Sequence, residues 1–449
     1  MKLIYGVKDK PSLGKTIVFA FQQLLAILAA TIAVPAIVGN GMSQSAALFG
    51  AGVGTLVYLL FTKFRSPVFL GSSFAFLGSM FAAFAGAVSA EAGYAGLLIG
   101  AAFAGLVYVV IALVVKFAGV KWINKLMPPV VIGPTVALIG LSLAGNAVGD
   151  ALTGATNNGS AYEMGAAGWV SIVCALVTLA TVMICSVYGK KMAKMIPFII
   201  GIAAGYAVAS IFTVIGNATA NDALKVIDFS AFSSMKWIPD FTFLKAFKGI
   251  SAIDGKYVAT IAVAYIPVAF VVFAEHIADH KNISSIIDSD LLEDPGLHRT
   301  LLGDGVGSVA GAFFGGCPNT TYGESIGCVA ISGNASVVTI LTTACLAVVA
   351  AFIAPFTTFL ATIPSCVMGG VCISLYGFIA VSGLKMVQKV DLGDNRNLFV
   401  VSVILITGIG GMTLKIFSVT LTEIACALIL GIITNLILSR NQDEEVAAA

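Results

Sequence analysis

The sequence predicts an all-α polytopic membrane protein with about 14 transmembrane spans, arranged as an inverted repeat of seven plus seven. Composition, the spacing of apolar runs and the placement of basic residues lead to this prediction. Hydrophobic residues make up 59% of the 449 residues and charged residues only 10%. A chain of this composition does not have enough polar residues to face water on all sides. Its 48 glycines also suit helices that pack closely in lipid.

Charge and cysteine content exclude several function classes. A formal net charge of +2 gives no basis for a nucleic-acid partner. The eight cysteines include no C-x-x-C pair, so neither a zinc ribbon nor a disulfide framework is indicated. No cofactor is expected. The charged N-terminus leads into an apolar run of about twenty residues without a cleavage site, which we interpret as a retained first span.

The predicted spans follow from the apolar runs, since each crossing needs about twenty apolar residues. The first seven are expected to begin near residues 16, 45, 67, 94, 128, 168 and 195, and the second seven near residues 256, 301, 315, 335, 362, 396 and 419. The third, ninth and tenth spans are short or broken. A count by hydropathy alone is therefore expected to return about twelve or thirteen spans.

Basic residues give the orientation, because Lys and Arg accumulate in short cytoplasmic loops. Three quarters of the 24 fall in segments that are cytoplasmic if the N-terminus is inside, so both termini are predicted to be cytoplasmic. Most of the others lie in residues 218–255, which we interpret as an external linker. Seven spans on each side of this linker force the two halves to enter the membrane in opposite senses. Secondary transporters are built on this plan, so we expect a transporter and not an enzyme.

Two hydrophobic segments are interrupted at matching places, each the third element of its half: PVFLGSSFAF (67–76) and GGCPNTTYGE (315–324). We expect short broken helices there, with or without short strands. Unwound backbone at the mouth of a half-helix exposes N–H groups with positive dipole character. Phe74 and Gly323 are therefore expected to present backbone N–H groups toward the centre. The alternative is a notch of small residues that serves helix packing.

Five acidic residues are embedded in apolar sequence: Glu275, Asp279, Asp304, Glu324 and Glu423. Ionisable groups at membrane depth are costly and usually functional. Glu275 and Asp279 are four residues apart and so share one face of a helix, and Glu324 follows the second broken segment. Asp304 and Glu423 lie near predicted helix ends, where a capping or solvated carboxylate is the simpler interpretation.

His276 and His280 have the spacing of a zinc-binding helix pair, but no glutamate lies between them in the required place. We interpret His276 as a residue that hydrogen-bonds to a neighbouring helix. We place His280, beside Lys281, at the cytoplasmic end of its helix. No metal site is predicted, and an intramembrane metalloenzyme stays a third-ranked alternative.

The chain resembles the nucleobase/cation symporter 2 family, also called nucleobase/ascorbate transporters. The resemblance covers essentially the whole chain and is carried by QQLLAILAATIAVP (22–35), FLGSSFAF (69–76), FAEHIADH (273–280), DPGLHRTLLGDG (294–305) and GGCPNTTYGESIGCVAI (315–331). TTYGE followed by Ser is typical of the uracil-transporting branch. The resemblance implies proton-coupled uracil uptake across a bacterial cytoplasmic membrane, with uracil, protons and membrane lipid as partners.

The resemblance also implies two domains. The core domain consists of residues 1–127 (spans 1–4) and 256–358 (spans 8–11). The gate domain consists of residues 128–217 (spans 5–7) and 359–440 (spans 12–14). Residues 218–255 link the two halves, and residues 441–449 form a disordered tail. Exposed gate surfaces in this family often support dimers, so a homodimer through the gate domain is a candidate assembly.

Site residues are carried over by motif. Glu275 and Glu324 are the substrate-binding glutamates, Phe74 and Gly323 donate backbone N–H groups, and Ala30, Tyr322 and Tyr376 pack around the ring. We add Ser73 to the substrate site and give a supporting role to Asn319, Thr320, Gln22, Gln23 and His276. The chain departs from the family at two places: Asp279 stands where some members have His, and Gln22-Gln23 where many have Gln-His.

Uracil fits these groups because its two N–H donors and two carbonyl acceptors complement two carboxylates and two backbone amides. Burial disfavours the ionised form of a carboxyl group and neighbouring carboxylates repel, so Glu324 or Glu275 is expected to take up the coupled proton, with Asp279 on the proton route. The nearest alternative is a permease for xanthine, uric acid or another nucleobase. An anion exchanger or channel is less favoured because the site carries acids and neither Arg nor Lys.

Overall fold

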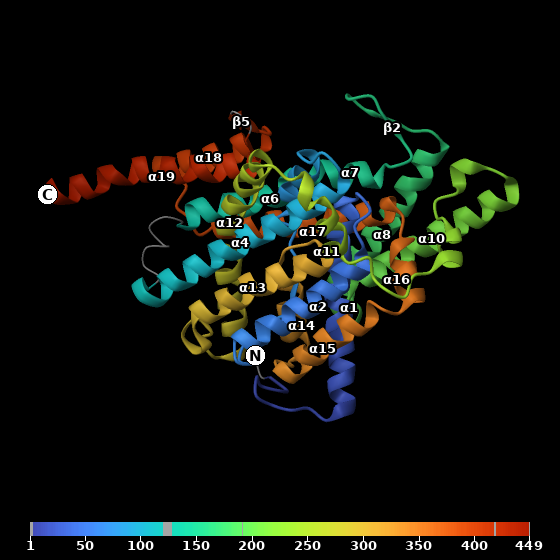
Figure 1. The fold of residues 1–449 in the computed structure, drawn as a ribbon, viewed down its shortest axis with the longest axis horizontal. Coiled ribbons are helices and arrows are strands. Elements are labelled where there is room, and N and C mark those ends of the chain that lie inside the picture. The colour runs from blue at the N-terminus through green and yellow to red at the C-terminus, as the bar shows by residue number, and fades with distance from the viewer. Residues whose placement is uncertain (1–2, 120–127, 191, 417–418, 449) are drawn as a thin grey trace.

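The computed structural model describes residues 3–448 except 120–127, 191 and 417–418. The described chain is almost wholly helical, and its strands form three two-stranded pairs (Figure 1). The predicted boundary at residue 127 lies outside the described residues, as do Lys2, Lys121, Lys125 and Lys191, which contributed to the orientation.

The half before the linker begins with the elements of the first four predicted spans: α1 (Leu13–Val38), α2 (Gln44–Phe61), β1 (Leu70–Ser72) with α3 (Leu77–Ala85), and α4 (Ala90–Ala118). It continues with α6 (Pro129–Ser142) and α7 (Ala144–Ala151), the hairpin β2 (Thr156–Asn157) and β3 (Tyr162–Glu163), α8 (Ala166–Tyr188), α9 (Met192–Met195) and α10 (Pro197–Thr219).

The half after the linker follows the same order: α12 (Gly255–Ile287), η4 (Leu292–Gly296), α13 (Leu297–Gly315), β4 (Asn319–Thr321) with α14 (Gly323–Ser332), and α15 (Val337–Ala350) with α16 (Ala354–Ala361). It ends with α17 (Ser365–Val387), α18 (Asn395–Ile409), the hairpin β5 (Leu414–Ile416) and β6 (Val419–Leu421), and α19 (Glu423–Ala448).

Each of the 14 predicted spans corresponds to one of these elements or pairs of elements, in order and with seven on each side of the linker. Within the described residues, only eight helices are long and apolar enough to cross a membrane alone, and α15 and α16 form a ninth candidate bent by 83°. A shortfall in the hydropathy count is therefore confirmed, but it is larger than predicted. Spans 3 and 10 are each a short strand followed by a short helix. In addition, α13 is not apolar enough, α15 and α16 are bent against each other, and α18 and the apolar part of α19 are too short.

Side-chain caps fix where several spans begin. The hydroxyls of Ser43 and Ser89 accept the N–H of Ala46 and Ala92 at the starts of α2 and α4. The carboxylate of Asp254 caps α12 in the same way. Caps of this kind satisfy N–H groups that the first turn of a helix leaves free.

The two broken spans meet through their strands. β1 and β4 pair antiparallel, with Gly71 opposite Thr320. The pairing is extended on one side by the N–H of Ser73, 2.9 Å from the carbonyl of Pro318, and on the other by the N–H of Tyr322, 3.2 Å from the carbonyl of Phe69. Hydrogen bonding between strands satisfies backbone groups that a broken helix would otherwise leave bare in the membrane. The expected short strands are thus confirmed.

Glycines let the helices around these strands approach closely. A Cβ at Gly54 on α2 would lie 2.7 Å from the carbonyl oxygen of Gly307 on α13 and would overlap Nδ2 of Asn319. That amide donates to the carbonyl of Gly50 at 3.1 Å, which ties β4 to α2. The strand pair is therefore held against a rigid helix pair.

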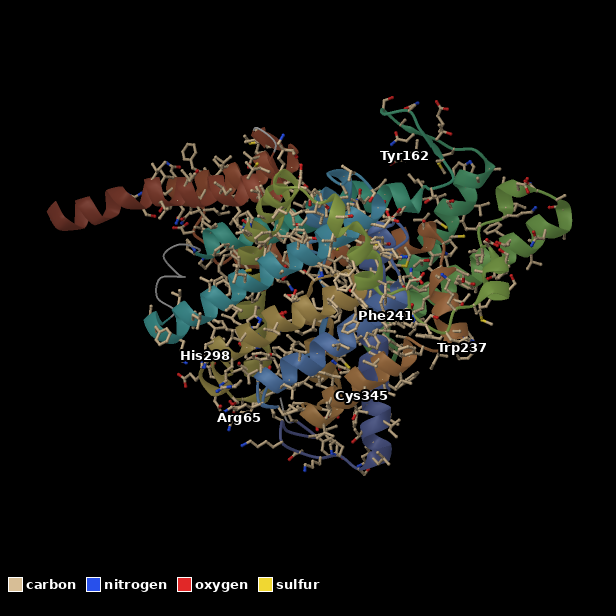
Figure 2. All side chains as sticks on the ribbon, viewed as in Figure 1. Arg65, Tyr162, Trp237, Phe241, His298 and Cys345 are labelled. Atoms are coloured by element: carbon tan, nitrogen blue, oxygen red, sulfur yellow. The ribbon has the colours of Figure 1, made fainter. Side chains whose placement is uncertain are left out.

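The linker holds four short helices: η1 (Asp222–Leu224), η2 (Phe229–Ser234), α11 (Thr242–Gly249) and η3 (Ile250–Ala252). α11 packs on α4 and α13, where the rings of Phe243 and Phe313 stack 4.8 Å apart. Tyr162 of the β2–β3 hairpin and Trp237 of the linker lie on the right of Figure 2, whereas Arg65 and His298 lie on the left. In this view the β2–β3 hairpin and Trp237 lie on the side opposite Arg65, whereas Phe241 of the linker lies near the centre.

Two predictions about helix ends are wrong. α12 continues through Lys281 to Ile287, so His280 lies inside the helix and is completely buried. Residues 441–448 continue α19 in place of a disordered tail. Gln, Glu and Ala dominate that stretch and are strong helix formers, so an existing helix propagates through it.

Candidate substrate site

A cavity of about 390 Å³ lies beside the paired strands. One wall comes from α12, β4–α14 and the segment after β1, and it contains the polar residues Glu275, Asp279, Thr320, Thr321, Tyr322, Gly323, Glu324 and Ser73 together with Phe74 and Ala75. The opposite wall comes from α6, α10 and α17 and consists of Val136, Ile139, Phe198, Leu375, Phe378, Ile379, Ser382 and Met386. The cavity thus has one acidic wall and one almost wholly apolar wall. We call it the central cavity.

The two predicted glutamates meet in this cavity although 49 positions separate them in the chain. Glu275 reaches it from the middle of α12, and Asp279 follows one turn later on the same face. Glu324 lies in the first turn of α14. All three carboxyl groups therefore surround one space, as the sequence predicted for a substrate site.

Asp279 is held by a neighbour from the broken span. Oγ1 of Thr321 donates to Oδ2 of Asp279 at 2.6 Å. This hydrogen bond joins α12 to the end of β4, immediately before the residues that open α14. A short bond to a carboxylate is of the stronger, charge-assisted kind when Asp279 is ionised.

Two helix N-termini open at the central cavity. Tyr322, in extended conformation, precedes α14, and Gly323 and Glu324 form its first turn. Phe74 lies three residues before Leu77, the first residue of α3. First-turn N–H groups have no partner within their own helix and lie at the positive end of the helix dipole. Gly323 therefore sits where hydrogen-bond acceptors are favoured. Phe74 lies two residues before Phe76, the N-cap of α3, so its N–H is not a first-turn group and its predicted donor role stays a prediction.

Gly323 is open to the cavity, since a Cβ there would meet no atom within 4 Å. Tyr322 is buried beside it, and its Oη donates to the carbonyl of Ser72 at 2.8 Å. The phenol thus cross-links the two broken spans, a role in addition to its predicted packing against a ring.

Other predicted site residues lie behind the cavity wall. The ring of Tyr376 is buried and meets that of Phe74 edge to face, with centroids 5.9 Å apart. Ala30 is buried in α1 and does not line the cavity. The remaining members outside the lining are Asn319, Gln22, Gln23 and His276.

Gln23 has a specific supporting contact. Its Nε2 donates to the carbonyl of Ser325 at 3.1 Å and also bonds the Ser325 hydroxyl. That hydroxyl accepts the N–H of Phe69 at 3.2 Å. The side chain therefore ties α1 to α14 and to the strand β1, directly behind Glu324.

Sequence reasoning missed the role of Asp304. This carboxylate is 1% exposed in the middle of α13, and its Oδ2 lies 2.7 Å from Nδ1 of His276. Nε2 of the same ring lies 2.9 Å from Oγ1 of Thr300. The prediction that His276 bonds to a neighbouring helix is confirmed, whereas a solvated or capping Asp304 is wrong. Asp304 lies four residues from Thr300 on α13 and 28 positions from His276 on α12, so only the tertiary fold brings the three groups together.

His280 extends this buried group. Its Nδ1 donates to the carbonyl of His276 at 2.8 Å, and its Nε2 lies 2.7 Å from the hydroxyl of Tyr58 on α2, which also bonds Ser66. All four ring nitrogens of the two histidines thus face protein partners. Among the described residues, no group of three or more His, Cys, Asp or Glu is placed to hold a metal ion.

The sequence matches a known family. The sequence model of the family described as "Permease family" matches residues 14–417. The chain therefore belongs to this family, the nucleobase/ascorbate transporters. Uracil permease of Bacillus caldolyticus is 40% identical over 97% of this chain and 95% of its own length. Uracil permease of Bacillus subtilis (strain 168) is 37% identical over 99% and 97%, and that of Escherichia coli (strain K12) is 33% identical over 96% and 93%.

Solved structures with the same fold are more distant in sequence. The transmembrane domain of the cyanobacterial bicarbonate transporter BicA aligns with a TM-score of 0.65 at 17% identity, over 96% of this chain and 100% of that one. Murine Slc26a9, an anion transporter in an inward-facing state, aligns with a TM-score of 0.67 at 12% identity, over 97% and 69%. At these identities the likeness confirms the seven-plus-seven fold and nothing about substrate.

Proposed function

We propose that this chain carries uracil together with protons into the cell, by alternating access around the central cavity, and that it is a carrier and not an enzyme. The observation that supports this most directly is the wall on which Glu275, Glu324 and two helix N-termini face one space. The relatives that match nearly end to end are named uracil permeases.

The cavity complements uracil in shape and in hydrogen bonding. Its volume of about 390 Å³ lies within the usual range for small-molecule pockets, roughly 300 to 1,000 Å³. Glu275 and Glu324 accept the two ring N–H groups, and the N–H groups of Phe74 and Gly323 donate to the two carbonyls. Phe198 and Phe378 on the apolar wall cover the faces of the ring. A base that presents an acceptor in place of one N–H would leave a carboxylate unpaired, at a cost of about 1 to 3 kcal/mol.

Proton coupling follows from the charge of this wall. Three carboxyl groups line the cavity, and neither Lys nor Arg is among the residues that line it. A neutral base cannot compensate several negative charges in a place of low dielectric. We assign the coupled proton to Glu324 or Glu275, with Asp279 and its Thr321 hydrogen bond on the route.

The two walls belong to the two parts that move. α1–α4 and α12–α15 form the core domain, and α6–α10 and α17–α19 form the gate domain. Rocking of one part against the other would expose a fixed site to each side in turn. We place the protein in the bacterial cytoplasmic membrane with both termini in the cytoplasm, in contact with lipid through its exposed apolar residues, and we propose a homodimer through the gate domain.

Uptake of labelled uracil into proteoliposomes tests the proposal. We expect accumulation that rises with an inward proton gradient and is abolished by Glu324→Gln. Glu91→Gln, an exposed acid in the first turn of α4, is the matched control and should transport normally. Uptake of uracil that is independent of the proton gradient would refute the proposed proton coupling. Stronger competition by xanthine than by uracil would favour a purine permease, and uptake of bicarbonate or chloride without uracil would favour an anion carrier.

A further inference from the structure

A second cavity of about 350 Å³ lies next to the central cavity. Its lining includes Phe74 and Ile139, which also line the central cavity. The residues that give it chemical character are Phe81, Ser142, Asn146 and Glu423. It is therefore a separate chamber that shares one wall with the proposed uracil site.

The two chambers are consecutive sections of one cleft between α3 and α6. On α6, Val136 and Ile139 line the central cavity, and Ile139, Ser142 and, beyond the helix end, Asn146 line the second. These positions recur every three or four residues and so lie on one helical face. On the other side of the cleft, Phe74 is followed by Gly78 and Phe81 of α3. Phe74 on one side of the cleft and Ile139 on the other therefore lie at the boundary between the two chambers.

The chambers extend toward opposite ends of the helices. α6 runs antiparallel to α17: a Cβ at Gly133 would lie 3.0 Å from N of Val387, and one at Gly140 would lie 2.6 Å from N of Ala380. The central cavity reaches Met386 near one end of α17. Asn146 lies on α7, which continues the span of α6, seven residues beyond Ile139 and about 10 Å farther along the span, away from that end. The second chamber therefore lies toward the opposite end of this span from Met386.

Its polar groups repeat the chemistry of the central cavity. Glu423, in the first turn of α19, is a half-buried carboxylate that can accept N–H groups. The amide of Asn146 can donate to a carbonyl and accept from an N–H. The hydroxyl of Ser142 donates to the carbonyl of Ile139 at 3.1 Å, so its oxygen is left as an acceptor. Phe74 and Phe81 offer aromatic surface for a flat ring. Neither Lys nor Arg is among the residues that line this chamber.

We propose that this chamber is a second binding site for the same neutral, flat base, which occupies it before passing Phe74 and Ile139 into the central cavity. Glu423 accepts a ring N–H, Asn146 pairs with the adjacent carbonyl, and the Phe74 ring separates the two positions. The inference rests on the proposed transport of uracil.

A cysteine reporter tests occupancy directly. Gly78 lines the chamber, and a Cβ there would meet no atom within 4 Å, so Gly78→Cys fits without displacing a neighbour. Purified protein with and without this substitution is treated with a methanethiosulfonate reagent at increasing uracil concentration. The difference between the two proteins gives the labelling of the reporter. The measurement is repeated with Glu324→Gln, Glu423→Gln, Asn146→Leu or Glu91→Gln added.

We expect uracil to slow labelling of the reporter, and to do so also beside Glu324→Gln, whose substitution lies in the central cavity. Glu423→Gln replaces a charge-assisted hydrogen bond by a weaker neutral one and should raise the protecting concentration roughly fivefold. Asn146→Leu removes its hydrogen bond and should raise it about tenfold. Glu91→Gln should leave it unchanged. In uptake assays, Glu423→Gln should raise the KM for uracil while the equilibrium affinity of the central site stays the same.

Two results would overturn the second site. One is Gly78→Cys protein that transports uracil but whose reporter uracil does not protect. The other is protection that is insensitive to both Glu423→Gln and Asn146→Leu. Failure of the proposed function looks different. In that case the wild-type protein neither takes up nor binds uracil, whatever the reporter shows.

Discussion

Gly71→Ala is the substitution whose effect follows most directly from the geometry of the site. Gly71 lies in β1 opposite Thr320. A Cβ there would overlap Cε2 and Cζ of the Tyr322 ring and lie 2.8 Å from its Oη. Since unstrained contacts of such atoms are about 3.5 to 4.0 Å, the ring has to retreat by about 1 Å.

The ring cannot retreat freely. Tyr322 is 4% exposed, and its Oη is bonded to the carbonyl of Ser72 at 2.8 Å. Overpacking of this kind costs about 1 to 3 kcal/mol. The residues after Tyr322 are Gly323 and Glu324, and a shift of about 1 Å would lengthen their hydrogen bonds to substrate from about 2.9 Å to beyond bonding distance. Each bond lost weakens binding by about a factor of ten.

The assay measures the Tm of purified protein and the Kd for uracil on the same samples. We expect Gly71→Ala to lower the Tm by several degrees, as about 1 to 3 kcal/mol implies, and to weaken uracil binding about ten- to a hundredfold. Gly377→Ala on α17 is the matched control, because a Cβ there would meet no atom within 4 Å. Unchanged Tm and Kd in Gly71→Ala would refute the reasoning about the Tyr322 clamp.

Three further predictions concern the polar groups of the site. Glu324→Gln should abolish proton-driven uptake and retain uracil binding, because an amide resembles the protonated acid but cannot release a proton; gradient-driven uptake by this variant contradicts the assignment. Thr321→Val removes the donor to Asp279 and should shift the pH profile of uptake, as should Asp279→Asn; identical profiles in both would remove Asp279 from the proton route. Gln23→Leu leaves Ser325 without its amide partner and should cost about 1 to 3 kcal/mol of stability, seen as a lower Tm; an unchanged Tm would show that the contact contributes nothing.

Local patterns predicted the parts of the site that lie within single elements. A spacing of four positions between Glu275 and Asp279 is enough to place both on one helical face, and the structure places both in one cavity. The Gly and Pro residues of the two interrupted segments marked where helices could not continue. Matching positions in two halves of opposite orientation predicted that both segments face the centre, and in the structure they meet there through β1 and β4. Periodicity and chain breaks are local properties, so they can be read without the fold.

Contacts between residues far apart in the sequence could not be predicted from local patterns. Asp304 was set aside because it lies near the glycines of a short span, where a helix end is a reasonable expectation. Only the packing of α13 on α12 brings it to His276, 28 positions away. Likewise, Lys281 suggested a helix end after His280, but that ring is buried inside the helix and bonds the hydroxyl of Tyr58 from another part of the chain. The charge of Lys281 does not indicate whether His280 is buried, because neighbouring residues of a helix point in directions about 100° apart.

α12 has two faces with different surroundings: one carries Glu275 and Asp279, whose shared position was predicted, and the other carries His276 and His280, whose partners were not. His276 and Glu275 are one residue apart, about 100° around the helix, and His280 and Asp279 repeat the offset one turn later. The histidine face is closed by Asp304, Thr300 and the Tyr58 hydroxyl.

Buried polar groups are costly when unpaired, so rotating α12 within the core would break several of these bonds at about 1 to 3 kcal/mol each. α12 is therefore locked in rotation to α2 and α13, and the carboxyl face is kept toward the cavity. If access alternates, the acidic wall has to move as one unit with the helices behind it. The wall formed by α6, α10 and α17 presents apolar side chains such as Val136, Ile139 and Leu375 to the cavity. These side chains form no hydrogen bonds, so none has to break when the two walls move past one another.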